Sequence, residues 1–365
     1  MMKTKIAVVT GTRAEYGIWK PVLAAIGRSK KLRLQLIVTG MHLQKQFGYT
    51  VDDIVEPIAA RVPMYRGGRS AGRSLACGIA GMSEVFAELR PELVMVLGDR
   101  LEIFAAASAA MACQIPIAHV HGGETAPGQW DEQIRHAITK MAHLHFCATE
   151  VAGRRILRMG EEPGNVHVVG APALDAVHAS RESIPAKAGA ICLLHPSSSD
   201  DAVERQRACL LLRALKNQGV CFSAIGPNND PGYAGILRAY REHEVPVVMS
   251  LCQAAFWERL AGSSMLIGNS SSGILEAASF GVSVINVGER QAGRERNGNV
   301  LDVPWGAGVA GIEGAIRRAM TDAAFRRRVA TRRNLYGDGC AAERICRVLE
   351  SIRFPISSVK RFYDR

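Results

Sequence analysis

Long apolar runs, aromatic residues and paired cysteines, which would mark a membrane, secreted or zinc-binding protein, are scarce in this sequence. The longest largely apolar run, residues 103–113, is too short to span a bilayer, and the apolar stretch near the start is too short for a secretory signal. Aromatic residues make up only 6%, and the nine cysteines are scattered singly, without a C-x-x-C pair. A disulfide framework and a structural zinc site are therefore disfavoured. We expect a cytoplasmic protein with reduced thiols.

Acidic residues are outnumbered. The chain has 45 Lys and Arg against 34 Asp and Glu, a formal net charge of +11, and residues 313–365 alone hold 12 Arg and one Lys against six acids. No nucleic-acid recognition motif or aromatic-interleaved patch accompanies this charge, so basic solvated helices are favoured over a nucleic-acid partner. An excess of arginine also suits an anionic, phosphate-bearing substrate.

What the sequence does contain is one theme repeated along its 365 residues. Short β-branched runs end in glycine or polar turns, and a helical pattern follows each of them. The theme continues to about residue 175, is interrupted by a linker at 176–188 that contains Ser and Pro, and then restarts. This alternation predicts an α/β protein with two doubly wound, Rossmann-like domains, 1–175 and 189–345, that face each other across a cleft.

In open α/β sheets, ligands bind beyond the carboxyl ends of the strands, so the turns there are the first places to look for a site. Gly11-Thr12-Arg13 offers N–H groups and a guanidinium at a helix start, although such turns are often only tight turns. The run GNSSSG at 268–273 could cradle a diphosphate, with Glu276 holding ribose hydroxyls; an N-capping serine with a capping-box acid fits the spacing equally well. The run is neither a Walker P-loop nor G-x-G-x-x-G, which disfavours ATP and NAD.

Acids, bases and glycines concentrate in residues 119–136, HVHGGETAPGQWDEQIRH. His119 and His121 stand two apart on a predicted strand, on one face, and with Glu124 they could bind a metal. Proton transfer is favoured for His121 and Glu124, which Asp131 follows closely, because a chelate would enclose a flexible pair of glycines.

Other titratable residues also lie at strand ends. Asp99 ends a very apolar strand beside Arg100; such a carboxylate is more often structural, but the first sheet would direct it to the predicted cleft. His195, at the first strand end of the second domain, is an acid/base candidate that faces the same cleft. His143 and His145 could form a second metal pair, but histidines bonded to backbone are the better interpretation.

Seven motifs, in this order and spacing, resemble those of the hydrolysing UDP-N-acetylglucosamine 2-epimerases of bacterial sialic acid biosynthesis: GTRAEYG, VTGMHL, GDRLE, HGGE, DEQIRHAITKMAHLH, GNSSSGILE and GERQAGR. The resemblance runs from about residue 4 to about 305, and more faintly to the terminal VKRFYD. It implies a glycosyltransferase-B-like architecture in which the segment 346–365 packs back on the first domain. It also implies a homodimer that needs no metal and no other cofactor.

The resemblance implies a reaction as well, in which UDP-N-acetylglucosamine and water give N-acetylmannosamine and UDP. A base removes the C2 proton, UDP leaves C1, and water adds to the 2-acetamidoglucal that forms. By their motifs, Asp99 and Asp131 are expected to be catalytic carboxylates, and His195 to lie at the diphosphate as a proton donor. The residues expected to bind substrate or UDP are Arg13, Arg100, Asn228, Ser270, Ser271, Glu276 and Arg290.

The sequence departs from the family pattern at one chemically important position. Several relatives have a glutamate where this chain has His121, so the base of that turn is either Glu124 or His121 itself. Serines follow His195-Pro196 where relatives often have threonines, which is a mild change.

The choice of sugar follows from the loop at 66–75, which is polar and has no aromatic residue to pack on a methyl or acetyl group. It favours UDP-N-acetylglucosamine. The alternatives are UDP-2,4-diacetamido-2,4,6-trideoxyglucose, used for legionaminic acid, and a nucleotide-sugar-binding or transferase protein of the same fold.

Overall fold

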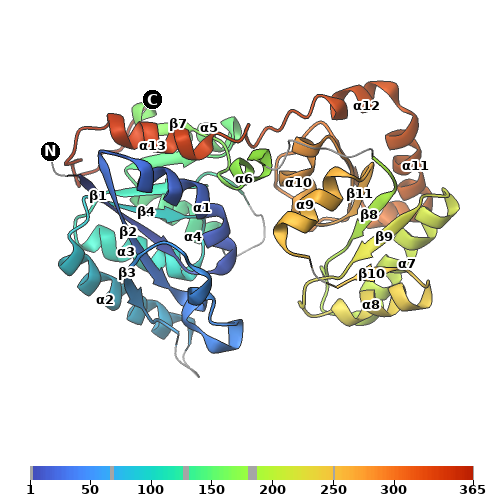
Figure 1. Cartoon of the computed structure of the whole chain (residues 1–365), viewed down its shortest axis with the longest axis horizontal. Coiled ribbons are helices and arrows are strands. Elements are labelled where there is room, and N and C mark those ends of the chain that lie inside the picture. Colours follow the sequence, from blue (N-terminus) through green and yellow to red (C-terminus); the bar gives the residue numbers. More distant parts are fainter. Residues whose placement is uncertain (1–2, 66–69, 126–130, 180–186, 250, 365) are drawn as a thin grey trace. The chain divides into compact units, whose positions relative to one another are not determined.

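The chain folds into two compact units, each built around its own parallel sheet (Figure 1). The computed structural model describes residues 3–65, 70–125, 131–179, 187–249 and 251–364. Unit 1 comprises Met1–Ala176 and Tyr336–Arg365, and unit 2 comprises Val177–Leu335. Two α/β units with parallel sheets confirm the predicted fold class. Among the described residues, no helix is long and apolar enough to cross a membrane.

Unit 1 contains a seven-stranded sheet in the order β3-β2-β1-β4-β5-β6-β7. Its strands are β1 (Thr4–Thr10), β2 (Leu32–Thr39), β3 (Ile58–Val62), β4 (Leu93–Leu97), β5 (Ile117–Val120), β6 (Leu144–Cys147) and β7 (Val166–Val168). Its helices are α1 (Arg13–Arg28), α2 (Ala71–Leu89), α3 (Leu101–Ala112), α4 (Asp131–Met141), α5 (Glu150–Arg158) and α13 (Ala341–Ser351), and α6 (Ala173–Ala179) spans the boundary between the units. The order in which the chain adds strands to this parallel sheet reverses between β1 and β4, which makes the carboxyl ends of these strands the favoured ligand position.

Side chains of β1 show why this sheet needs helices on both faces. Ile6 and Val8 pack in a core with residues of α1 and α13, whereas Ala7 and Val9 pack in a second core with residues of α2, α3 and α4. A strand buried on both faces is a nearly continuous apolar run, as the sequence shows here. Thr12 follows β1 and fixes the start of α1, because its side chain accepts a hydrogen bond from the Glu15 N–H and caps the helix.

The chain returns to unit 1 at Tyr336, earlier than the expected residue 346. Two contacts fix this earlier return: the Tyr336 carbonyl accepts from the Ala171 N–H at 2.6 Å, and the Asp175 carboxylate accepts from the first N–H groups of α13 at 2.7 and 2.9 Å. The helix α13 lies beside α1 (Figure 1), and Glu350 accepts a hydrogen bond from Ser29. The part of the predicted linker at 180–186 lies outside the described residues.

Unit 2 contains a six-stranded sheet in the order β10-β9-β8-β11-β12-β13. Its strands are β8 (Ala190–Leu193), β9 (Phe222–Ile225), β10 (Val247–Val248), β11 (Met265–Gly268), β12 (Ser283–Val287) and β13 (Val300–Val303). Its helices are α7 (Asp201–Asn217), α8 (Tyr233–Glu242), α9 (Gln253–Ala261), α10 (Ser271–Leu275), α11 (Gly308–Thr321) and α12 (Ala323–Ala330). Here the order reverses between β8 and β11, so the turns after these two strands are the corresponding ligand position.

Candidate functional site

The turn after β4 holds Asp99 in an ion pair, but not with the neighbour that the sequence suggested. Arg135 of α4 donates a hydrogen bond through Nη2 to Asp99 Oδ2, and both side chains are largely buried. The Nη1 atom of Arg135 also lies 3.8 Å from Glu132 Oε2. Arg100, which follows Asp99 in the sequence, contacts Glu102 instead, with Nε 3.5 Å from Oε1. Arg135 therefore joins the end of β4 to helix α4.

Asp131 begins α4 and lies within electrostatic reach of Asp99. Burial raises the pKa of Asp131, and the negative charge of Asp99 raises it further. Asp131 also lines a cavity of about 420 Å³ in unit 1, together with Tyr65, Arg100 and Glu102. A carboxylate with a raised pKa that lines a cavity is a candidate for proton transfer.

His121 and Glu124 form a dyad in the turn after β5. His121 has a left-handed backbone, with φ of 62°, and its Nδ1–H donates to Glu124 Oε1 at 2.5 Å. The Nε2 atom of His121 is buried and has no hydrogen-bond partner among the described residues. This arrangement leaves the lone pair of Nε2 as the proton acceptor, while Glu124 orients the ring and would stabilise it if it were charged.

His119 does not join His121, so the two do not share a face as the spacing suggested. His119 is fully buried: its Nε2–H donates to the Gly98 carbonyl at 2.8 Å, and its Nδ1 lies 3.2 Å from Thr139 Oγ1. Burial lowers the pKa of His119 to about 3, so the ring is neutral. Within the part of the chain that the structure describes, no three His, Cys, Asp or Glu side chains group in a way that could hold a metal ion.

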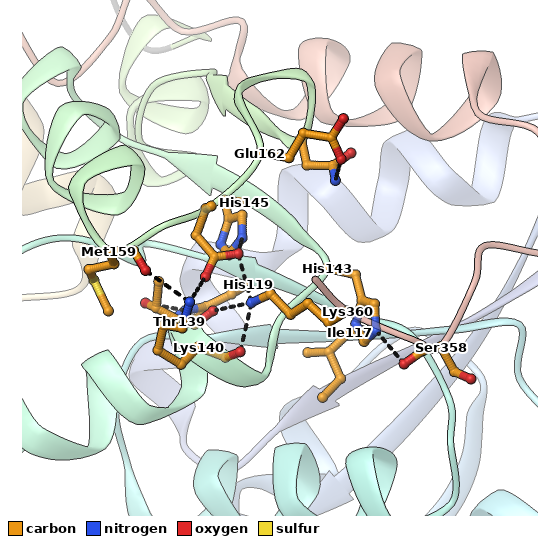
Figure 2. A network of polar contacts seen from close by, with 12 residues as sticks. Ile117, His119, Thr139, Lys140, His143, His145, Met159, Glu162, Ser358 and Lys360 are labelled. Atoms are coloured by element: carbon orange, nitrogen blue, oxygen red, sulfur yellow. Dashed lines mark hydrogen bonds and ion pairs between the residues drawn. The ribbon is translucent and has the colours of Figure 1, made fainter. Parts of the chain in front are cut away.

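The second predicted histidine pair separates in the same way. His143 is bonded to backbone, because its Nδ1 accepts from the Ile117 N–H at 3.2 Å and its Nε2 donates to the Ser358 carbonyl at 3.1 Å. His145 is bonded instead to a carboxylate, since its Nε2–H donates to Glu161 Oε2 at 3.1 Å (Figure 2). The expectation of backbone partners was therefore right for His143 and wrong for His145.

Two buried carboxylates lie at the ends of β1 and β4 near Arg100. Glu15 accepts from the Gly11 N–H at 2.8 Å, and burial together with Glu102 raises the pKa of Glu15 to about 8. Glu102 is 1% exposed. Arg13, in contrast, projects from the start of α1 with 78% of its side chain exposed, and its Nε lies 3.7 Å from Asp53. Arg13 is thus exposed enough to meet an anion even beside Asp53, while Arg100 lies against the buried Glu102.

In unit 2, the turns after β8 and β11 are tied together by Asn269. Its Oδ1 accepts from the His195 N–H at 2.7 Å, and its Nδ2 donates to the His195 carbonyl at 2.8 Å. The imidazole of His195 accepts at Nδ1 from the Asn228 N–H at 3.1 Å. Burial and the charge of Arg290 lower the pKa of His195 to about 4. His195 is therefore neutral, with its proton on Nε2, and acts as a hydrogen-bond donor rather than a charged acid.

Arg290 and the serine run surround the same asparagine. The Asn269 carbonyl accepts from Arg290 Nη1 at 3.4 Å and from Gln291 Nε2 at 2.9 Å. Ser270 caps α10, and its hydroxyl lies 2.9 Å from that of Ser272. Gly268 precedes them at φ of 143°, where a Cβ atom would lie 2.0 Å from the Leu193 carbonyl oxygen. Only glycine can bring the two strand ends this close.

Glu276 does not complete a capping box, so that part of the alternative interpretation is wrong. It follows α10, whose first residue is Ser271, and its Oε2 accepts from Trp257 Nε1 at 3.1 Å. Burial raises the pKa of Glu276 to about 7. A half-buried carboxylate that accepts from an indole N–H can accept further hydrogen bonds from ligand hydroxyls.

Several residues that build these turns were not among the predicted site residues. Arg135, Asn269 and Trp257 each contact a predicted site residue, yet each lies on a different element from its partner. Glu204 of α7 supports the turn after β8 in the same way. Its buried carboxylate accepts from the N–H groups of Ser197 and Ser198 in that turn, at 3.1 and 2.9 Å. An Asp or Glu in the first turn of a helix, as at Glu204, is the one feature that could have suggested a partner for the preceding loop.

Comparison with known proteins gives a consistent assignment. Residues 24–350 match the family model described as UDP-N-acetylglucosamine 2-epimerase. A UDP-N,N'-diacetylbacillosamine 2-epimerase (hydrolyzing) of Legionella pneumophila is 37% identical over 96% of this chain and 97% of its own length. A UDP-N-acetylglucosamine 2-epimerase of Neisseria meningitidis is 32% identical over 82% of this chain and 84% of its own length.

The fold is similar to that of solved structures. The crystal structure of the Neisseria meningitidis UDP-GlcNAc 2-epimerase bound to UDP-GlcNAc aligns with a TM-score of 0.81, at 19% sequence identity, and covers 96% of this chain and 100% of that one. At this identity the likeness concerns the fold alone.

Proposed function

The chain belongs to the UDP-N-acetylglucosamine 2-epimerase family, and on that premise we propose that it is a hydrolysing 2-epimerase of a UDP-linked 2-acetamido sugar. The proposed substrate is UDP-N-acetylglucosamine, and the products are N-acetylmannosamine, the starting sugar of sialic acid biosynthesis, and UDP. The observation that carries the proposal is the gathering of proton-transfer groups after β4 and β5: the Asp99–Arg135 pair, Asp131, and the His121–Glu124 dyad.

These groups fit an elimination followed by a hydration. The unpartnered Nε2 of His121 takes the C2 proton, and Glu124 stabilises the imidazolium that forms. The electron pair of the C2–H bond forms the C1–C2 double bond, and UDP leaves with the electrons of the C1–O bond. Asp131, with its raised pKa, is suited to hand protons to and from the water that then adds. Unit 2 binds the UDP: His195 donates to the diphosphate, Arg290 balances its charge, and Glu276 accepts from the ribose.

The diacetamido sugar is a second candidate, and two observations favour it. The relative named for UDP-N,N'-diacetylbacillosamine, which is the 2,4-diacetamido-2,4,6-trideoxyglucose nucleotide, is 37% identical over 96% of this chain. Tyr65 also lines the unit 1 cavity, where an aromatic ring could pack on a methyl or acetyl group. Ser74, Arg100 and Glu102 line it as well and favour hydroxyls. Residues 66–69 of the loop that suggested the sugar lie outside the described residues.

The deciding experiment measures UDP release from each nucleotide sugar by the purified protein, with no acceptor present. We expect release of UDP together with a free 2-epimerised sugar, and one deuterium at C2 of the product when the reaction runs in D2O. A UDP-bound epimer as the product would indicate a non-hydrolysing epimerase, and no turnover of either sugar would refute the proposal. Comparing kcat/KM in a mixture of the two sugars then identifies the substrate.

Two further properties of the proposal rest on the family resemblance. We propose that the protein is a homodimer and that it acts in the cytoplasm. Light scattering of the purified protein measures the first property, and a molar mass near the 39.4 kDa of one chain would contradict it.

A further inference from the structure

The VKRFYD segment near the end of the sequence has no role in the chemistry proposed above, yet it is held firmly against unit 1. Lys360 Nζ donates to the Lys140 carbonyl at 2.6 Å and lies 2.7 Å from Glu161 Oε2 (Figure 2). The Tyr363 N–H donates to the Gly160 carbonyl at 3.0 Å. We call the segment Ser358–Tyr363 the strap.

The strap also contacts unit 1 through the ring of Phe362, although 66% of this residue is exposed. The Phe362 ring covers Gly160, where a Cβ atom would lie 2.3 Å from the ring, and Gly160 has φ of 79°. Lys140 Nζ lies 4.9 Å from the centre of the same ring. Glycine at position 160 therefore suits the left-handed backbone and lets the Phe362 ring lie directly over it.

Glu161 is the ionic centre of this contact. It is 2% exposed and is surrounded by three donors, because Lys140 Nζ lies 2.6 Å from Oε1, and Lys360 and His145 contact Oε2. Burial by itself would raise the pKa of Glu161, but these hydrogen bonds together outweigh it and lower the pKa to about 2, so that the carboxylate is ionised. Removing one cation from a buried group of this kind leaves charge uncompensated, and the remaining partners must move or hydrate.

The strap acts on the carboxyl end of α4. Lys360 Nζ lies within hydrogen-bonding distance of the carbonyls of Lys140 and Thr139, at 2.6 and 3.4 Å, and these belong to the last turn of the helix. A cation at that position satisfies the Lys140 carbonyl, lies near the Thr139 carbonyl, which also accepts from the Ala142 N–H at 3.2 Å, and interacts favourably with the helix dipole. Lys360 thereby fixes one end of α4, and Asp131 stands at the other.

Two short connections lead from this anchor to Asp99. The helix itself carries Arg135, which donates to Asp99. The side chain of Thr139 lies 3.2 Å from His119 Nδ1, and His119 donates to the carbonyl of Gly98, the residue before Asp99. Both connections start at the last turn of α4, which Lys360 holds.

We propose that Lys360 is a positioning residue, which through the last turn of α4 holds Asp131 and Arg135 in place for proton transfer at Asp99. The inference rests on the proposed function, since it assigns these residues to the reaction. Lys360 does not touch the substrate. Its loss misplaces the acid/base groups while leaving UDP bound normally in unit 2.

The test compares Lys360→Met with Arg361→Met in the full-length chain. Each variant removes one positive charge from the same segment, but Arg361 is exposed and stands outside the contacts described above. We expect Lys360→Met to lower kcat about 10-fold or more, since small misplacements of catalytic groups are costly, with KM and UDP inhibition within about twofold of the unaltered protein. Arg361→Met should leave all three unchanged.

Hydrogen–deuterium exchange of the α4 amides provides a measurement that needs no substrate. We expect faster exchange over 135–141 in Lys360→Met and unaltered exchange in Arg361→Met. Unchanged exchange would overturn the proposal, as would faster exchange with normal kcat at a temperature well below the melting point. An unaltered protein inactive on both sugars would refute the proposed function and this role with it; faster exchange in Lys360→Met would still show that the anchor itself exists.

Discussion

Asp99→Asn tests most directly whether the Asp99–Arg135 pair serves catalysis or only the fold. The substitution keeps the size of the side chain and an oxygen that can accept from Arg135, but it removes the charge and the ability to exchange a proton. Arg135 retains Glu132, whose Oε2 lies 3.8 Å from its Nη1. The change therefore weakens a largely buried ion pair, but Arg135 keeps Glu132 as a charged partner.

The expected effects on stability and on rate differ enough to be separated. Weakening a hydrogen bond to a charged group costs about 1–3 kcal/mol. A protein of ordinary stability, about 5 kcal/mol or more, would keep at least about 2 kcal/mol and remain about 97% folded. Loss of proton transfer lowers kcat by about 10²-fold or more, which corresponds to about 2.7 kcal/mol in the barrier. Unfolding of a few per cent of the molecules cannot produce such a loss.

The assay combines kcat, UDP affinity by calorimetry and the free energy of unfolding in urea. Asp52→Asn is the matched control, because Asp52 is an exposed aspartate of the same unit. We expect unchanged UDP affinity in both variants and a large loss of kcat only in Asp99→Asn. If kcat of Asp99→Asn stays within about threefold of the unaltered protein while its stability falls, Asp99 is structural and the reasoning is wrong.

Other expectations concern pH, the nucleotide and metals. In Asp99→Asn, the acid limb of the kcat/KM profile should move to lower pH, because the charge of Asp99 raises the pKa of Asp131; a limb that stays in place would remove Asp131 as the group responsible. UDP affinity should fall as pH drops below about 7, because ribose hydroxyls bind the ionised form of Glu276, whose pKa is raised to about 7, and Glu276→Gln should abolish that part of the dependence. Arg290→Ala should raise KM and weaken UDP inhibition with little change in kcat, and normal UDP affinity would place the nucleotide elsewhere. Treatment with EDTA should leave turnover unchanged, and inhibition reversed by a divalent ion would contradict the metal-free mechanism.

Much of the fold was predictable because parallel strands buried on both faces leave a strong signal. The strands β1, β4, β5, β8, β11 and β12 are nearly continuous apolar runs, and each ends in a glycine or polar turn. The strands that the sequence did not reveal are β3, β10 and β13, and all three are edges of their sheets. An edge strand pairs on one side only, so it can be short, as at Val247–Val248, or can carry a charge, as at Arg61, without a recognisable pattern.

The turns on which the candidate residues stand were predictable from the sequence, but the hydrogen-bond partners of those residues were not. Asp99, His121 and Glu124 follow strands of unit 1 and His195 follows a strand of unit 2, as the strand-end turns of the sequence indicated. The partner of Asp99 was not predictable from adjacent residues, since Arg100 turns to Glu102 and Arg135 arrives from another element.

The sequence by itself determined the chemical types present and the turns on which they stand, because local propensity and apolar patterning are properties of short segments. Tertiary structure alone decided the protonation and orientation of those groups. His119 and His121 are two residues apart in the sequence, yet their surroundings differ. His119 is a buried, neutral ring that donates to the Gly98 carbonyl, whereas His121 has a left-handed backbone and donates to Glu124. Likewise, only the folded chain brings Lys360 to the end of α4. Burial and partner charges set a pKa, and both depend on residues far away in the sequence.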